Sequence, residues 1–172
     1  MKLTIIFASA IIAIAGSASA QDAKETKVGA WTVRTISDPI TDQSRVIAAL
    51  EGSGGSLVVK CDSPGPDSVY IHFIAGEYLG EGRSGRREVI QRFDDAAPVT
   101  NQWTHDGRAA ILTNNREVAS FVRSLIGATR VVIRARTFQF KEVTALFDVN
   151  SADAEKATKH VYDGCRDVWP AS

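Results

Sequence analysis

The side chains that could carry catalysis in this chain are three histidines. His72 falls in a predicted strand, His105 in a predicted turn and His160 on the polar face of a predicted helix. A metal site needs several such ligands to converge on one ion, and nothing in this spacing brings the three together. We therefore expect no metal site and no metal-dependent chemistry.

The usual motifs of nucleophilic catalysis are also missing. The chain has no Gly-x-Ser-x-Gly sequence, and the neighbouring Asp94 and Asp95 point to opposite faces of a strand, so they do not share a proton. The glycine-rich stretch 52–56 is followed by neither Lys-Ser/Thr nor a helix, so it is not a phosphate loop. These features predict a non-enzymatic protein without a cofactor. A small exported hydrolase with a site near Asp94 and His105 remains an alternative.

Arginines are the best candidates for binding a partner. One group lies in a Gly/Ser-rich loop, and a second follows one face of a predicted strand over residues 129–137. Either group could meet an acidic partner or an anionic glycan, whereas the alternative is a solvated sheet face paired with carboxylates such as Glu142. The candidate partner-binding residues are Arg83, Arg86, Arg87, Arg130, Arg134 and Arg136.

The first twenty residues have the three parts of an export signal. Lys2 supplies the positive charge, residues 3–15 are apolar, and Ala18-Ser19-Ala20 is a small-x-small cleavage site. The apolar run is too short to span a membrane. We expect a signal peptide over residues 1–20 and a single exported β-rich domain over residues 21–172, located in the periplasm or secreted.

Export changes the interpretation of Cys61 and Cys165, the only cysteines. In an oxidising compartment two cysteines favour one disulfide, although free or intermolecular thiols remain the alternative. The 20 basic and 20 acidic residues balance, which argues against bulk binding to nucleic acid or anionic membranes. No later segment is long and apolar enough for an integral membrane span, so the expected partner is another envelope protein.

The elements that must position these residues are mostly strands. Apolar residues alternate through most of residues 31–149 between turn sequences, and Cys61 falls on an apolar strand face. Helical spacing appears only over residues 117–126 and 151–164. The prediction is a mainly β protein, an antiparallel β-sandwich or flattened barrel with two packed α-helices. A barrel that binds a small ligand in its mouth is a further alternative.

The order of several short motifs resembles a known family, the small periplasmic accessory proteins associated with type VI secretion systems and related uncharacterised exported proteins of Gram-negative bacteria. The resemblance implies a non-enzymatic envelope protein linked to a secretion or envelope system, and it brings no catalytic residues. The motifs are Trp31-Thr32-Val33, Asp38-Pro39-Ile40-Thr41-Asp42, Leu57-Val58-Val59-Lys60-Cys61, Tyr78-Leu79-Gly80, Arg92-Phe93-Asp94, Trp103, residues 121–125, Phe147-Asp148-Val149 and Cys165.

Overall fold

The computed structural model describes residues 23–41, 43–81 and 85–170, so the expected signal peptide and Arg83 lie outside the described residues. The described chain forms ten strands and two helices. The strands are β1 (Ala23–Val28), β2 (Trp31–Ser37), β3 (Ser44–Gly52), β4 (Gly55–Cys61), β5 (Tyr70–Ala75), β6 (Arg86–Phe93), β7 (Val99–Asp106), β8 (Ala109–Leu112), β9 (Arg130–Arg136) and β10 (Glu142–Asp148), and the helices are α1 (Asn115–Gly127) and α2 (Ser151–Cys165).

All ten strands belong to one antiparallel sheet, in the order β1-β2-β3-β4-β5-β8-β7-β6-β9-β10. The sheet bends so far that β10, its last strand, reaches the turn between β3 and β4. There Ser53 and Leu146 exchange two backbone hydrogen bonds of 2.9 Å. The sheet does not close into a barrel. The prediction of a mainly β fold with two packed helices is confirmed.

Glycines allow this close approach between the β3–β4 turn and β10. A Cβ atom at Gly52 would stand 2.4 Å from the Leu146 carbonyl oxygen, and one at Gly54 would stand 2.5 Å from the Thr144 carbonyl oxygen. Gly54 also has a φ of +91°, which L-residues rarely adopt. The glycine-rich stretch therefore covers the edge of β10, which would otherwise be open to pairing with other strands.

The period-two pattern of the sequence explains the later strands. In β10 buried and exposed side chains alternate throughout, and β9 shows the same alternation except that the outward Val132 is only partly exposed. The opposite edge strand, β1, was not predicted, because only Val28 of its six residues is buried. The buried side chains of β9 and β10 are Val131, Ile133, Ala135, Val143, Ala145 and Phe147.

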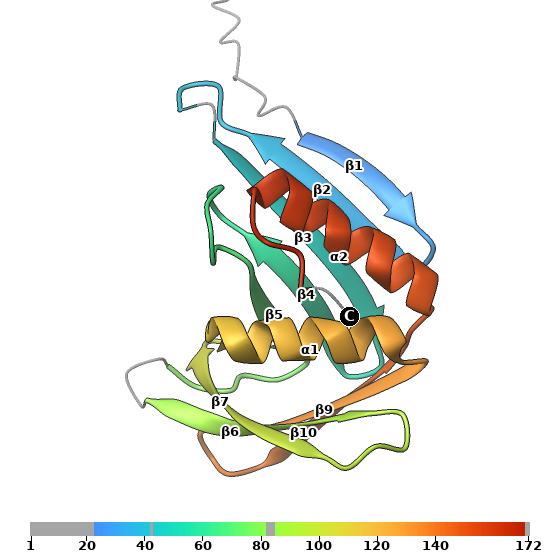
Figure 1. The fold of residues 1–172 in the computed structure, drawn as a ribbon. Helices are drawn as coiled ribbons and strands as arrows, with labels where there is room; N and C mark the ends of the chain where they lie inside the picture. Colours follow the sequence, from blue (N-terminus) through green and yellow to red (C-terminus); the bar gives the residue numbers. More distant parts are fainter. Residues whose placement is uncertain (1–22, 42, 82–84, 171–172) are drawn as a thin grey trace, which may run out of the picture.

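Both helices begin at an asparagine cap and lie on the same face of the sheet (Figure 1). The Asn114 side chain accepts the N–H of Glu117 at 3.2 Å, and the Asn150 side chain accepts the N–H of Asp153 at 3.1 Å. Helix α2 packs along β2 and β3 and contacts α1. The helices therefore cover the inner face of the bent sheet.

The disulfide between Cys61 and Cys165 is formed, with the two Cα atoms 6.2 Å apart. It joins the end of β4 to the end of α2, and both cysteines are fully buried. Asp167 supports the same junction, because its carboxylate accepts the backbone N–H groups of Asp67 and Val69 at 3.0 Å each. The predicted pairing and the inward direction of Cys61 are confirmed.

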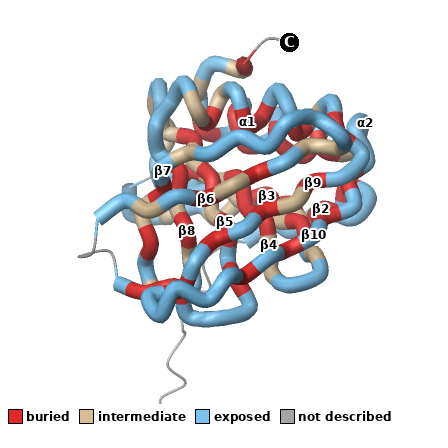
Figure 2. Tube along the Cα trace, turned by 90° about the horizontal axis from the view of Figure 1, so that it is seen from below, coloured by how far each residue is buried: buried red, intermediate tan, exposed pale blue. Residues whose placement is uncertain are grey.

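Buried residues gather between the helices and the sheet (Figure 2). Trp31 and Trp103 are almost completely buried, and their rings fill this space together with phenylalanines. The interior is thus a packed core, unlike the ligand-binding barrel considered above. Within the described part of the chain, the helices are too short or too polar to cross a membrane.

Candidate functional site

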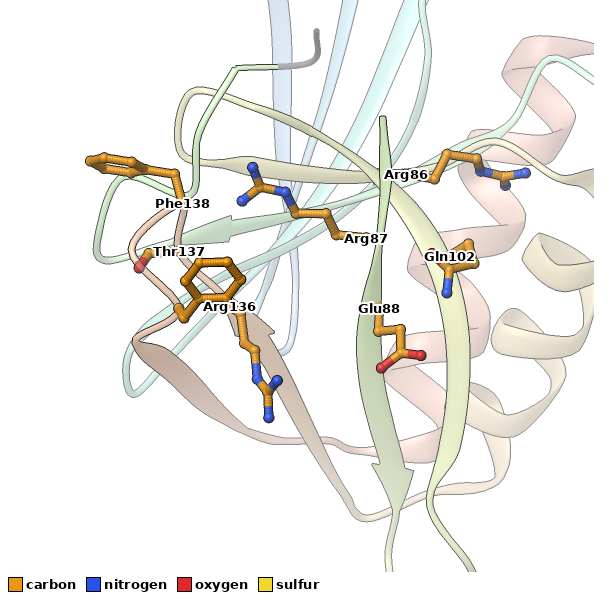
Figure 3. A pocket seen from close by; sticks show the side chains of 8 residues that line it. Arg86, Arg87, Glu88, Gln102, Arg136, Thr137 and Phe138 are labelled. Atoms are coloured by element: carbon orange, nitrogen blue, oxygen red, sulfur yellow. The ribbon is translucent and has the colours of Figure 1, made fainter. Parts of the chain in front are cut away.

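The most distinctive surface cavity lies where β6 and β9 separate. Strand β6 pairs with β7 from Arg86 to Gln91 but with β9 only from Ile90 to Phe93. The ladder between β6 and β9 stops at the Ile90–Arg134 pair, although both strands continue beyond it. A gap therefore opens between the start of β6 and the turn that joins β9 to β10. The gap holds a cavity of about 320 Å³. Its lining residues are Arg86, Arg87, Glu88, Gln102, Arg136, Thr137, Phe138 and Phe140, named here the arginine–phenylalanine pocket (Figure 3).

Three arginines from two strands are among the lining residues of this pocket. The Arg87 side chain points from β6 toward Phe138, and its Nη1 donates a hydrogen bond to the Leu79 carbonyl at 3.2 Å (Figure 3). Arg86 extends from the opposite side of β6 into solvent. Arg136 comes from the end of β9 and forms an exposed ion pair with Glu142 at 3.3 Å. Among the lining residues that the structure describes, Glu88 is the one acidic residue, so this part of the lining carries a net positive charge.

The turn between β9 and β10 displays two aromatic rings beside these arginines. Phe138 is half exposed and meets the Tyr78 ring edge to face, with 5.8 Å between ring centroids. Phe140 is 83% exposed and has a φ of +63°, in the left-handed region where bulky residues are rare. Thr137 holds the turn, since its carbonyl accepts the N–H of Phe140 at 3.0 Å and its hydroxyl accepts that of Lys141 at 3.2 Å.

An exposed aromatic residue in a strained conformation needs an explanation other than folding. Glycine is the usual residue at this position of a three-residue hairpin loop. A phenylalanine there makes the backbone less stable and buries almost no apolar surface in return. Backbone strain of this kind is concentrated at sites with a function. The Phe140 ring is therefore a candidate contact site, to be weighed with the rest of the pocket.

The structure brings together three of the five candidate arginines that it describes. Arg86, Arg87 and Arg136 line the pocket. Arg134 instead shares the Glu142 carboxylate with Arg136, at 3.5 Å, and Arg130 pairs with Asp95 at the far end of β9, also at 3.5 Å. These last two fit the alternative of a solvated sheet face with carboxylate partners.

The phenylalanines of the pocket were missed in the sequence. Phe138 and Phe140 flank a single glutamine between two predicted strands, and this alternation is also what buried strand residues show. No feature of the sequence shows that the chain turns there. The arginines alone were therefore recognised.

Asp94 and Asp95 have separate structural roles. Asp94 accepts hydrogen bonds from the Thr129 N–H at 2.9 Å, the Thr129 hydroxyl at 2.8 Å and the Arg130 N–H at 2.8 Å. These bonds, led by the Thr129 hydroxyl, lower the pKa of the Asp94 carboxyl. Asp95 is exposed and pairs with Arg130. Through these hydrogen bonds the Asp94 side chain links the end of β6 to the start of β9.

His105 lies in the core rather than in a turn, which corrects the sequence interpretation. It belongs to β7 and is fully buried, because the strand extends through Asp106. Burial first, and then the positive charge of Arg87, lower its pKa. Since His105 and Asp94 lie beyond opposite ends of the β6–β7 pairing, more than about 20 Å of strand separates them. The two side chains proposed for a hydrolase do not meet.

The other histidines also stay apart. Burial and the nearby Lys60 charge lower the pKa of the partly buried His72 to about 4. His160 is exposed on α2, with its Nε2 3.5 Å from the Thr35 hydroxyl. Among the residues that the structure describes, no group of three His, Cys, Asp or Glu side chains could hold a metal ion.

No protein-family model, curated protein or solved structure matches this chain. The function is therefore argued from the geometry of the pocket and from the chemistry of its residues.

Proposed function

We propose that this protein is a non-enzymatic accessory or binding protein of the bacterial envelope, and that the arginine–phenylalanine pocket binds an acidic segment of a partner protein. The observation that carries the proposal is the Phe140 ring, which is 83% exposed, held at a positive φ, and part of a pocket whose lining includes three arginines. Such a ring supplies apolar contact area at low cost in side-chain entropy when a partner covers it.

The charge of the lining favours an acidic partner. Three arginines and one glutamate surround the cavity, and arginine guanidinium groups pair with carboxylates through two parallel hydrogen bonds. Aromatic and arginine side chains together are the residues most enriched at binding hot spots. A segment that combines carboxylates with an apolar side chain matches both parts of the lining.

The gap in the sheet favours an extended partner segment. Residues 86–89 of β6 pair with β7 on one side, and no described strand pairs with them on the β9 side. An extended segment that enters the gap can add backbone hydrogen bonds to β6 while its side chains reach the arginines. About 320 Å³ accommodates a few side chains, not a folded domain.

The location belongs to the proposal as well. The Cys61–Cys165 pair at disulfide distance is consistent with an oxidising compartment outside the cytoplasm. The motif resemblance adds the hypothesis that the partner belongs to a secretion apparatus.

Affinity capture from a periplasmic extract tests the proposal. The wild-type protein should retain a partner that elutes as the salt concentration rises, because added salt screens exposed charges. Phe140→Gly should lose this partner, and so should the double variant Arg86→Gln/Arg136→Gln. Arg130→Gln, an exposed arginine outside the pocket, is the matched control and should retain it. Capture of no partner at any salt concentration, or equal capture by Phe140→Gly, would contradict the proposal.

A further inference from the structure

The two helices lie on the inner face of the sheet and leave its outer face uncovered (Figure 1). The solvated face of an antiparallel sheet usually carries polar side chains. In the neighbouring strands β3, β4, β5 and β8, however, six of the outward side chains are aliphatic. They are Ile47, Ala49, Val58, Ile74, Ala109 and Ile111, named here the outer apolar patch.

The strand registers make the middle of this patch continuous. Val58 lies between Ala49 of β3 and His72 of β5, and His72 lies opposite Ile111 of β8. Val58 is only 6% exposed although it does not belong to the core on the other face, so its outer-face neighbours shield it. Burial and the nearby Lys60 charge lower the pKa of His72 to about 4, so His72 is neutral at neutral pH. The four strands therefore present one row of outward side chains without charge.

Charges of opposite sign lie on the two sides of this row. Toward one end of the strands lie Arg45 and Lys60, which share the Asp62 carboxylate at 2.9 and 3.2 Å. Toward the other end lie Glu51 and Asp106, whose exposed side chains also point outward. Counting these five side chains, one side of the row is net positive and the other is negative.

We propose that the outer apolar patch binds a second copy of this chain, face to face, about a two-fold axis that runs along the row from Ala49 to Ile111. Rotation about this axis exchanges the two sides, so it brings the Lys60 side of one copy over the Glu51 side of the other. An axis parallel to the strands would instead bring like charges together. Sheets pack face to face about 10 Å apart, and the aliphatic side chains fill the space between them.

The size of this face suits a weak dimer. With β2 and β7 at its margins the face is six strands wide, about 29 Å, and three outward rows long, about 20 Å. Two copies would therefore bury about 1,200 Å², which is at the lower limit of standard interfaces. The expected dissociation constant lies in the micromolar range.

Sedimentation velocity of the purified protein, from low micromolar to near-millimolar concentration, tests this proposal. The wild type should shift from monomer to dimer across this range. Ile74→Lys should weaken the dimer at least about tenfold, because it places a charge against the apolar surface of the second copy. Leu146→Lys is the matched control, since Leu146 is exposed to a similar extent, 41% against 36% for Ile74, and lies on β10 outside the patch. It should dimerise as the wild type does, and thermal unfolding checks that both variants keep the fold.

An exchange of charges tests the direction of the two-fold axis. Glu51→Lys and Lys60→Glu should each weaken self-association, because each brings like charges together across the interface. An equimolar mixture of the two variants should associate about as well as the wild type. In the mixed dimer, position 51 of one copy meets position 60 of the other with opposite charges in both places.

Several results would overturn the proposal. They are a wild type that stays monomeric throughout the range, equal dimer formation by Ile74→Lys, loss of the dimer in Leu146→Lys, and a mixture of the charge variants that associates no better than either alone. Capture of phospholipid vesicles or of another periplasmic protein by a monomeric wild type, lost in Ile74→Lys, would assign the patch to that occupant and would also overturn the second copy.

This inference does not depend on the proposed function. Phe140→Gly should dimerise as the wild type does, because Phe140 lines the arginine–phenylalanine pocket and is not part of the outer apolar patch.

Discussion

Replacing Phe140 by glycine should make the protein more stable and less able to bind. A left-handed conformation costs an L-residue about 1–2 kcal/mol, whereas glycine loses about 0.5–1 kcal/mol of extra chain entropy on folding. Because the ring is 83% exposed, its removal sacrifices little buried surface. The difference is a gain of about 0.5–1 kcal/mol in the free energy of unfolding. For a chain of this size the thermal midpoint should rise by about 1–4 °C.

Phe138→Gly is the matched control in the same turn. Phe138 has no positive φ, so glycine relieves no strain there. It also removes the edge-to-face contact with Tyr78, and such contacts contribute about 0.5–1.5 kcal/mol. Together with the entropy of glycine, this variant should lose about 1–2.5 kcal/mol in the free energy of unfolding.

Urea unfolding of both variants and the wild type measures these differences. The midpoint should rise in Phe140→Gly and fall in Phe138→Gly while the slope stays constant. The reasoning is refuted if Phe140→Gly loses more than about 1 kcal/mol, because the turn would then depend on the ring. A gain in stability with unchanged partner capture would instead show that the strain has no role in binding.

Three further predictions concern stability. Cys61→Ala/Cys165→Ala opens a loop of 104 residues and should cost about 4–5 kcal/mol in urea unfolding, and a loss below about 1 kcal/mol would contradict the chain-entropy argument. Gly54→Ala should cost about 1–3 kcal/mol, because its Cβ would meet β10 backbone, while Gly65→Ala, with open space around it, should change little. The pKa of His72 is about 4 in the folded protein and about 6.5 in the unfolded chain. Between these values the unfolded chain binds more protons, so the contribution of neutral His72 to the free energy of unfolding is complete above pH 6.5 and is lost as pH falls toward 4. His72→Gln should therefore reduce the slope of the free energy of unfolding against pH between pH 6.5 and 4. The reduction is at most about 1.4 kcal/mol per pH unit, and it is smaller because solvent partly screens the ring. An unchanged slope would refute this prediction.

The burial of a residue could be predicted where the residues on either side of it in the sequence show a clear alternation. Cys61 falls on an apolar strand face, so its burial follows from period two alone. Strand β1 could not be recognised in this way, because an edge strand with one buried residue lacks the alternation on which such predictions depend. His105 was misplaced because the following Asp106-Gly107 pair suggests a turn that begins earlier than it does.

The residues of the arginine–phenylalanine pocket are far apart in the sequence, so their proximity in the folded protein could not be predicted. The three arginines of the pocket come from β6 and β9, whose paired residues lie between 38 (Phe93 and Val131) and 44 (Ile90 and Arg134) positions apart in the sequence. The two strands become neighbours only through the order of the sheet.

The position of β6 explains why side chains from both of its faces line one pocket. Arg87 has the same parity as the buried Val89 and Gln91, whereas Arg86 and Glu88 have the opposite parity. A neighbouring strand normally separates the two faces of a sheet, but β6 pairs with β9 only from Ile90 onward. Ahead of that pair no described strand lies on the β9 side of β6, so side chains of both faces border the gap. The mixed lining of arginines and phenylalanines therefore follows from the early separation of β6 and β9.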